Sequence, residues 1–205
     1  MIGIADSGST KCNWQLVDDS GSVRRVQSRG INAVLQRPDE VEALLRETFA
    51  EPVQADALHF YGAGCGERYP EQSARLREAL ARYFPAARIA VESDLMGAAR
   101  ALLGGRAGIA CILGTGSNSC LCRDGEILKN VPPLGYVLGD EGSGAVLGRN
   151  LVNGIFKGHI PLKEEFLAAH GLNYEEIIRR VYREPYANRF LACLLYTSPS
   201  PRDCS

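Results

Sequence analysis

The 205-residue sequence lacks an excess of charge of either sign and contains no long apolar run. Its 23 Lys and Arg side chains against 24 Asp and Glu give a formal net charge of -1, which provides no basic field for nucleic acid or for an anionic membrane surface. No apolar run approaches the roughly 18 residues of a membrane helix, and no basic segment followed by an apolar one opens the chain. We therefore expect a cytoplasmic protein whose partners include neither nucleic acid nor a membrane.

The sequence also lacks a cysteine framework for disulfides or metal. Its seven cysteines are an odd number, and most lie beside apolar or β-type residues, so buried free thiols are favoured over disulfides. One residue separates Cys120 from Cys122, whereas zinc sites usually have two residues between paired cysteines and add a second pair. The three histidines are scattered and accompany no nucleophile motif. We assign no metal to the cysteines.

The first half of the sequence predicts an α/β unit. Alternating apolar residues predict strands, the first three of which form an antiparallel meander, and apolar residues at helical spacing predict the segments between the later strands. The predicted strands are 2–5, 12–17, 23–29, 57–61 and 88–92, and the predicted helices are 39–51, 71–84 and 94–103.

The pattern restarts after the glycine-rich stretch 104–108. The predicted strands here are 109–113, 119–123 and 126–131, and the predicted helices are 141–156, 163–169 and 174–182. Strand, small-residue turn, strand, turn and strand thus occur twice, as a weak internal repeat. We expect a first lobe at 1–106 and a partial second lobe at 107–192.

The last residues differ in character from the rest of the chain. From Leu194 on the sequence has no periodicity, and it resembles the adapter-derived tails of translated metagenomic fragments. We therefore leave 193–205 out of the fold prediction. Because the second repeat stops after its helices, we expect the natural protein to be longer at its C-terminal end.

Two small-residue turns occupy equivalent places in the two repeats, in the segments ADSGSTKCNW (5–14) and LGTGSNS (113–119). Backbone N–H groups of such a turn can approach a phosphate, and Asp6 can hold a hydrated Mg²⁺. Neither turn is a Walker A loop or a dinucleotide-binding turn. One such turn alone is more often only a turn, but two in equivalent places predict that both bind one nucleotide. In the first, the expected phosphate-binding residues are Gly8, Ser9, Thr10 and Lys11.

Five segments, in this order, resemble a known group of ATPases: DSGSTKCNW, SRGIN, ESDLMGAARALLGG, ILGTGSNS and PLGYVLGDEGSGAVLGR. Together they are similar to the N-acetylglucosamine kinase group of the BadF/BadG/BcrA/BcrD ATPase family, within the actin, hexokinase and Hsp70-type superfamily. The resemblance covers 1–192. It implies an α/β, ribonuclease-H-like (actin/hexokinase-type) ATPase fold with one complete lobe plus an incomplete second lobe, and phosphorylation of a sugar hydroxyl with ATP and Mg²⁺.

Asp94 is the candidate catalytic residue. It follows a predicted strand and opens a predicted helix that Ser93 can cap, so its carboxylate is expected at the edge of the lobe. A kinase that acts on an alcohol needs a carboxylate to accept the hydroxyl proton. An aspartate in a first helical turn is otherwise usually a capping or dipole residue. The resemblance implies that Asp94 is the general base.

The resemblance implies roles for further residues. In the second turn, Gly114, Thr115 and Gly116 would bind ATP phosphate, while Ser117 and Asn118 would reach the sugar. Asn32 would bond sugar hydroxyls from the first lobe, and a turn asparagine is the structural alternative. Gly135 and Asp140 would lie on the substrate side, with an N-cap as the alternative for Asp140.

One position departs from the family pattern. Relatives with sugar kinase activity commonly carry Trp-Gly where this sequence has Leu134-Gly135. The aromatic wall against the sugar is therefore missing, which bears on the identity of the sugar more than on the kinase chemistry.

Two other functions fit the same fold. The first is an ATPase that activates a radical 2-hydroxyacyl-CoA dehydratase-type enzyme through an iron–sulfur cluster held by a dimer, but no cysteine lies in a plausible cluster loop. The second is a non-catalytic nucleotide-binding module, against which the presence of Asp6 and Asp94 argues. The superfamily's adenosine segment lies late in the second lobe and has no glycine-rich match after Phe156, so we expect this chain to bind ATP poorly, while its activity by itself is left open. A homodimer of the longer parent is left open.

Overall fold

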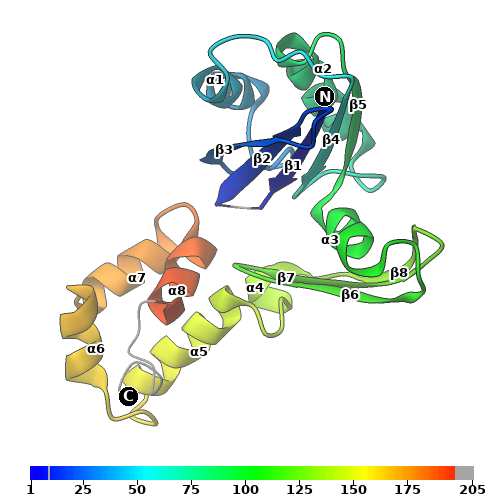
Figure 1. The fold of residues 1–205 in the computed structure, drawn as a ribbon. Helices are drawn as coiled ribbons and strands as arrows, with labels where there is room; N and C mark the ends of the chain where they lie inside the picture. The colour runs from blue at the N-terminus through cyan, green and yellow to red at the C-terminus, as the bar shows by residue number, and fades with distance from the viewer. Residues whose placement is uncertain (9, 197–205) are drawn as a thin grey trace. The chain divides into compact units, whose positions relative to one another are not determined.

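The structure is a computed structural model that describes residues 1–8 and 10–196 (Figure 1). It divides into two compact units. Unit 1 comprises Met1–Ala110 and Cys122–Leu128, and unit 2 comprises Cys111–Leu121 and the chain from Lys129 on. None of the described helices has the length and apolar character needed to cross a membrane.

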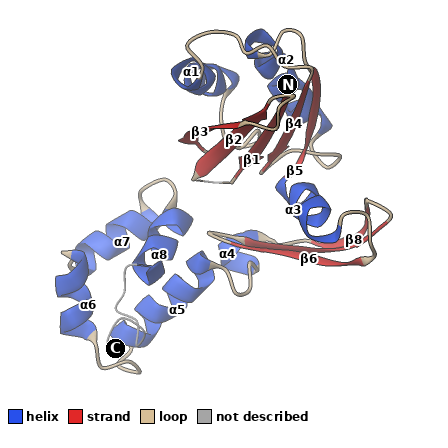
Figure 2. Ribbon diagram, in the orientation of Figure 1, coloured by secondary structure: helices blue, strands red, loops and turns tan. Residues whose placement is uncertain are grey.

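Unit 1 is built on a five-stranded sheet in the order β3-β2-β1-β4-β5 (Figure 2). The strands are β1 (Ile2–Ser7), β2 (Lys11–Val17), β3 (Val23–Arg29), β4 (Ala57–Gly62) and β5 (Arg88–Ser93). The first three form the predicted antiparallel meander, whereas β4 runs parallel to β1 and to β5. Because these three parallel strands share one direction, their carboxyl ends meet at one edge of the sheet.

An aromatic cluster fills one face of this sheet. Alternation along β2 and β4 buries Trp14 and Phe60, which pack with Phe49 and Phe84 beside the helices α1 (Pro38–Thr48) and α2 (Pro70–Tyr83). The rings of Trp14 and Phe49 meet edge to face, with centroids 5.0 Å apart. This packing gives the sheet a rigid apolar support on that side.

The opposite face carries α3 (Asp94–Leu103), which begins directly after β5. Tyr61 follows Phe60 along β4, so its side chain lies on the other face of the sheet, against Gly97 of α3. The hydroxyl of Ser93 accepts a hydrogen bond from the Met96 backbone N–H at 3.2 Å, so Ser93 is the N-cap that the sequence predicts.

A second sheet has the order β6-β7-β8. Its strands are β6 (Gly108–Leu113), β7 (Ser117–Arg123) and β8 (Glu126–Val131), so the strand repeat seen in the sequence is present. Helices follow, namely α4 (Gly135–Leu138), α5 (Gly144–Phe156), α6 (Lys163–His170), α7 (Tyr174–Tyr182) and α8 (Ala187–Tyr196). In residues 132–196 the structure contains no further strand.

Two sequence expectations for unit 2 are wrong. The predicted helix 141–156 begins at Gly144 instead, because Ser143 is its N-cap and accepts from the Val146 backbone N–H at 3.2 Å. The segment from Leu194 on was expected to have no regular structure, but α8 continues to Tyr196 and buries Leu194 in the core of unit 2. Residues 197–205 of the excluded tail lie outside the described part of the chain.

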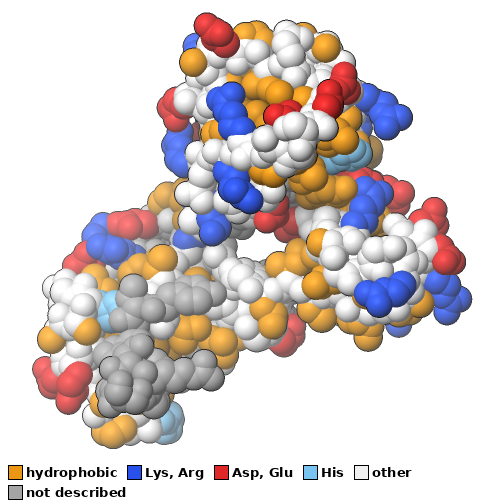
Figure 3. Space-filling view, viewed as in Figure 1, with side chains coloured by type: hydrophobic (Ala, Val, Ile, Leu, Met, Phe, Trp, Pro, Cys, Tyr) orange, Lys and Arg blue, Asp and Glu red, His pale blue; other side chains and the backbone are white. Residues whose placement is uncertain are grey.

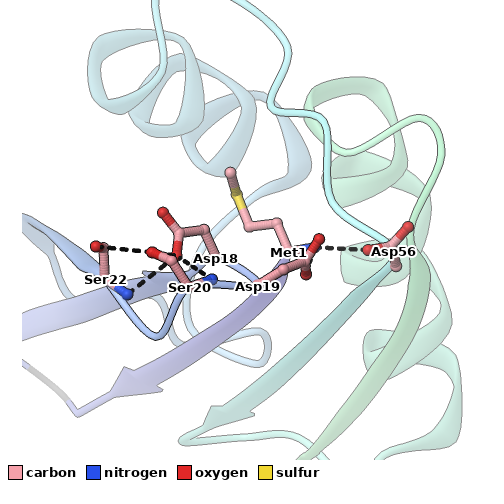
Figure 4. Close-up of polar contacts among 6 residues, drawn as sticks. All are labelled: Met1, Asp18, Asp19, Ser20, Ser22 and Asp56. Carbon is pink, nitrogen blue, oxygen red and sulfur yellow. Dashed lines mark hydrogen bonds and ion pairs between the residues drawn. The ribbon is translucent and has the colours of Figure 1, made fainter.

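The surface of unit 1 mixes charges of both signs. On the face shown in Figure 3, Lys and Arg side chains alternate with Asp and Glu. At the start of β1, the amino group of Met1 lies 2.6 Å from Oδ2 of Asp56 and 3.3 Å from Oδ1 of Asp19 (Figure 4). These exposed contacts raise the pKa of the amine, Asp56 most strongly. They secure the end of β1 that is remote from Asp6.

Candidate functional site

Asp6 and Asp94 lie at the edge of unit 1 where β1, β4 and β5 end. Asp6 is exposed near the end of β1, and Asp94 is half-buried at the start of α3. Burial raises the pKa of Asp94, and the negative charge of Asp6 raises it further, while the Leu95 backbone N–H, which donates to Oδ1 at 2.9 Å, acts in the opposite direction. A carboxylate with a raised pKa is a better proton acceptor than an ordinary aspartate.

The helix that carries Asp94 is fixed to the sheet by a charged contact. The guanidinium group of Arg100 donates to Oε1 of Glu92 at 2.9 Å and to the Tyr61 hydroxyl at 3.0 Å, with a second bond to Oε2 of Glu92. Since Ser93 provides the cap, the carboxylate of Asp94 is not needed for that role. The structure thus combines a firmly attached helix with an acidic side chain at its first turn.

The first turn, residues 8–10, joins β1 to β2. The Gly8 backbone N–H donates to the Lys11 carbonyl at 3.0 Å. A Cβ added to Gly8 would meet only that carbonyl oxygen, at 3.9 Å, and the glycine has no left-handed φ. Neither strain nor packing against the described residues explains this glycine, and the space in front of it suits the close approach of a phosphate. Thr10 and Lys11 are exposed beside it, and Ser9 lies outside the described residues.

A buried serine joins the first turn to the backbone just before Asn32, the sugar-binding residue predicted in unit 1. The Ser7 hydroxyl donates to the Ile31 carbonyl at 3.0 Å and accepts from the Ile31 N–H at 2.7 Å. The Gly30 N–H donates to the Thr10 carbonyl at 3.0 Å. Oδ1 of Asn32 accepts from the backbone N–H groups of the next turn, so Asn32 is a turn asparagine. Its contact with a sugar stays a prediction.

The glycine-rich loop after β4 approaches the start of α3. Gly66 has φ 96°, and a Cβ there would stand 3.1 Å from the Ser93 nitrogen. Cys65, buried in this loop, has its pKa raised to about 12, mainly by burial and then by the charge of Asp94. A thiol of that pKa stays protonated at neutral pH and is a poor ligand or nucleophile.

The second turn, residues 114–116, is bonded to the start of α5 in unit 2. The carbonyls of Gly114 and Thr115 accept from the N–H groups of Gly144 and Ala145, at 2.8 and 3.2 Å. A Cβ added to Gly114 would meet only the Gly116 carbonyl oxygen, at 3.9 Å, and φ is again ordinary. The two turns therefore share a glycine that nothing within the described chain requires.

Asp140 lies beside the second turn. A Cβ on Gly116 would stand 3.0 Å from Oδ2 of Asp140, and the Ser117 backbone N–H is hydrogen-bonded to the same carboxylate. Burial raises the pKa of Asp140, with a smaller contribution from the charge of Glu141, and the Ser117 contact lowers it. Asp140 has φ 55° and is not the helix cap. The structure thus brings together Asp140, Gly116 and Ser117.

Gly135 stands at the start of α4, with φ 74°, after the exposed Leu134. Its carbonyl accepts from the Gly139 N–H at 2.7 Å, and the Asp140 N–H donates to the Pro133 carbonyl at 2.7 Å. The short helix therefore leads the backbone directly to Asp140, and both predicted substrate residues belong to one connected segment.

Sequence reasoning missed two residues of these sites. Ser7 was counted with the turn, and Asn130, whose amide bonds to Asn118, was assigned only to a strand. Counting outward from the hairpin turn 124–125 places Asn130 opposite Ser119. This strand register could have shown from the sequence that Asn130 lies close to Asn118.

Among the described residues, no group of three or more His, Cys, Asp or Glu side chains could hold a metal ion. Mg²⁺ in phosphate-transfer sites is usually held by one or two carboxylates together with phosphates and water, and the exposed carboxylate of Asp6 fits that requirement.

The chain is similar to several solved structures. It is 47% identical to the "Putative N-acetylglucosamine Kinase" from Porphyromonas gingivalis, with a TM-score of 0.86, covering 94% of this chain and 70% of that one. For the "Putative N-acetylglucosamine Kinase" from Chromobacterium violaceum the identity is 22%, the TM-score 0.72 and the coverage 96% and 72%. For the ethanolamine utilization protein EutJ from Carboxydothermus hydrogenoformans the values are 15%, 0.50, 94% and 65%. No family model and no curated protein matches the chain.

The last two likenesses, at 22% and 15% identity, show the fold alone. They agree with the predicted fold class, an α/β, ribonuclease-H-like ATPase fold with one complete lobe plus an incomplete second lobe, which is confirmed. The 47% identity to the Porphyromonas protein extends over nearly the whole chain. This chain therefore belongs to the N-acetylglucosamine kinase-type family of actin/hexokinase-like ATPases.

Proposed function

We propose that this chain is part of an ATP-dependent sugar kinase, most similar to N-acetylglucosamine kinases, with Asp94 as general base. The observation that carries the proposal is the raised pKa and the fixed position of the Asp94 carboxylate in a chain of this family. Its carboxylate has a raised pKa and stands at the first turn of a firmly attached helix, at the same edge of the sheet as Asp6. A base for an alcohol needs both properties, a fixed position and affinity for a proton.

MgATP would supply the phosphoryl group that the sugar oxygen accepts. Asp94 would take the proton of that sugar hydroxyl as the new oxygen–phosphorus bond forms and the bond from the γ-phosphorus to the bridging oxygen breaks, so that ADP leaves. The open backbone at Gly8 would bind phosphate together with Ser9, Thr10 and Lys11, and Asp6 would hold the Mg²⁺ through water. Gly114, Thr115 and Gly116 would bind phosphate from the second turn.

Each unit contains polar residues that we propose as sugar-binding residues. From unit 1 we propose Asn32, and from unit 2 Ser117, Asn118, Gly135 and Asp140. The buried carboxylate of Asp140 can accept hydrogen bonds from sugar hydroxyls, because its raised pKa makes it a stronger hydrogen-bond acceptor. The exposed Leu134, which stands where relatives have an aromatic residue, leaves the amino sugar less enclosed, so related sugars are candidate substrates.

A panel of sugars with coupled ADP detection tests the proposal. Replacing Asp94 by Asn should lower turnover by on the order of a hundredfold or more and leave nucleotide binding intact. Asp39→Asn is the matched control, because Asp39 is also an aspartate in a first helical turn. Turnover by Asp94→Asn at the wild-type rate would refute the role of Asp94, and no ADP formation with any sugar would refute the kinase function.

A further inference from the structure

The side-chain amides of Asn118 and Asn130 form a hydrogen-bonded pair in unit 2, next to the second turn. Nδ2 of Asn130, on β8, donates to Oδ1 of Asn118, on β7, at 2.7 Å and to the Ser119 carbonyl at 2.8 Å. The Ser119 backbone N–H also donates to Oδ1 of Asn118, at 2.9 Å. Two donors of the chain itself therefore occupy the oxygen of the Asn118 amide.

Backbone groups determine which end of each amide is oxygen and which is nitrogen. A backbone N–H can only donate, so the atom of Asn118 that faces the Ser119 N–H must be the oxygen. A backbone carbonyl can only accept, so the atom of Asn130 that faces the carbonyls of Ser119 and Val131, the latter at 3.3 Å, must be the NH₂ group. The two ends of an amide are otherwise hard to distinguish, and here the backbone distinguishes them.

The nitrogen of the Asn118 amide remains available. No hydrogen bond between described residues uses it, and it is not among their buried polar atoms without a partner. Asn118 as a whole is half-buried, so its NH₂ group reaches solvent next to Ser117. The amide of Asn118 thus offers the two N–H groups of its nitrogen to a ligand, while its oxygen already accepts two hydrogen bonds.

We propose that Asn130 is a positioning residue that holds the amide nitrogen of Asn118 outward, so that Asn118 binds its ligand as a hydrogen-bond donor. The inference rests on the proposed function for the class of ligand, a sugar. It adds the direction of the contact. A hydroxyl or carbonyl oxygen of the sugar accepts a hydrogen bond from the amide of Asn118, and the sugar hydroxyls donate their own hydrogen bonds to other groups.

Replacement of Asn118 by Asp separates donor from acceptor. The carboxylate keeps the bonds from Ser119 and Asn130 but turns an oxygen outward. Titration with N-acetylglucosamine, without nucleotide, should show affinity about tenfold lower for both Asn118→Asp and Asn118→Ala, the order of one lost hydrogen bond. Thermal unfolding of Asn118→Asp should match the wild type. Wild-type sugar affinity in Asn118→Asp would overturn the proposal, because the sugar would then be the donor.

Asn130→Ala tests the positioning role. Sugar affinity should fall about threefold to tenfold, whereas Asn150→Ala, an exposed asparagine of α5, should bind like the wild type. Side-chain amide exchange followed by NMR gives a readout that needs no ligand. The NH₂ protons of Asn130 should exchange slowly and those of Asn118 and Asn150 fast. Fast exchange at Asn130 would overturn the proposal, while slow exchange without any sugar binding would refute only the kinase function.

Discussion

Gly97 of α3 lies so close to Tyr61 of β4 that a Cβ at position 97 would stand 2.8 Å from both Cβ and Cγ of Tyr61. These atoms are close to the backbone and cannot turn aside, so Gly97→Ala should force α3 away from the sheet. We expect it to destabilise unit 1 by about 1–3 kcal/mol, more than the roughly 1 kcal/mol that alanine gains over glycine within a helix. Because Trp14 is the single tryptophan and lies in the core of unit 1, its fluorescence in denaturant measures this change.

A Gly97→Ala protein as stable as the wild type would show that α3 does not depend on this close approach. The same experiment reports on catalysis, because α3 carries Asp94 at its first turn. A displaced helix should lower turnover together with stability.

Gly8→Ala should behave in the opposite way. Its Cβ would meet nothing nearer than the Lys11 carbonyl oxygen at 3.9 Å, so the denaturation midpoint should stay that of the wild type. If a phosphate approaches this backbone, the methyl group obstructs it, and affinity for MgATP should fall about tenfold or more, the order of one lost charge-assisted hydrogen bond. Titration calorimetry decides the point. Unchanged affinity would exclude the first turn as a phosphate site.

Local patterns predicted the fold well where burial alternates. The strands β2 and β4 were found because one face of the sheet is buried at every second residue, as at Trp14 and Leu16 of β2. The N-cap at Ser93 was also predictable, because capping depends on a few neighbouring residues.

The candidate site was harder to predict, because its polar residues lie on strands. Asp6, Ser117 and Asn118 were assigned to turns, because Asp and Asn are depleted in strands and all three residue types are common in turns. In the structure the strands continue through these positions, and Asp6, for example, pairs with Asn13 of β2. The contact of Asn130 with Asn118 depends on strand register, which composition does not reveal. Tertiary pairing therefore determined these positions.

Ser7→Ala should weaken the link between the first turn and the loop at Ile31. The mutation leaves a buried N–H and a buried carbonyl of Ile31 without their partner, which typically costs about 1–3 kcal/mol. Ser22→Ala, on an exposed serine, is the control for the same change of side chain. Trp14 fluorescence in denaturant compares the two. Equal stability of both variants would mean that water replaces the Ser7 hydroxyl.

Asp94→Asn should make the fold more stable at neutral pH. Burial raises the pKa of Asp94, so the folded chain holds the proton more tightly than the unfolded chain does. The favourable contribution of this group is then complete below the ordinary pKa of aspartate and is lost as the pH rises through the raised pKa. At neutral pH the wild type therefore retains a carboxylate whose ionisation burial opposes, and asparagine removes that cost.

The gain should shrink as the pH falls through the raised pKa towards the ordinary aspartate range, because the wild-type carboxyl then becomes neutral as well. Asp39→Asn, at an exposed aspartate that pairs with Arg37, should give no gain at any pH. Denaturation of the three proteins across that pH range makes the comparison. If Asp94→Asn were less stable than the wild type at neutral pH, contacts of the ionised carboxylate would outweigh its burial. If the prediction holds, the ionised carboxylate of Asp94 destabilises the fold. A bound ligand whose hydroxyl donates a proton or a hydrogen bond to this carboxylate would remove part of that cost.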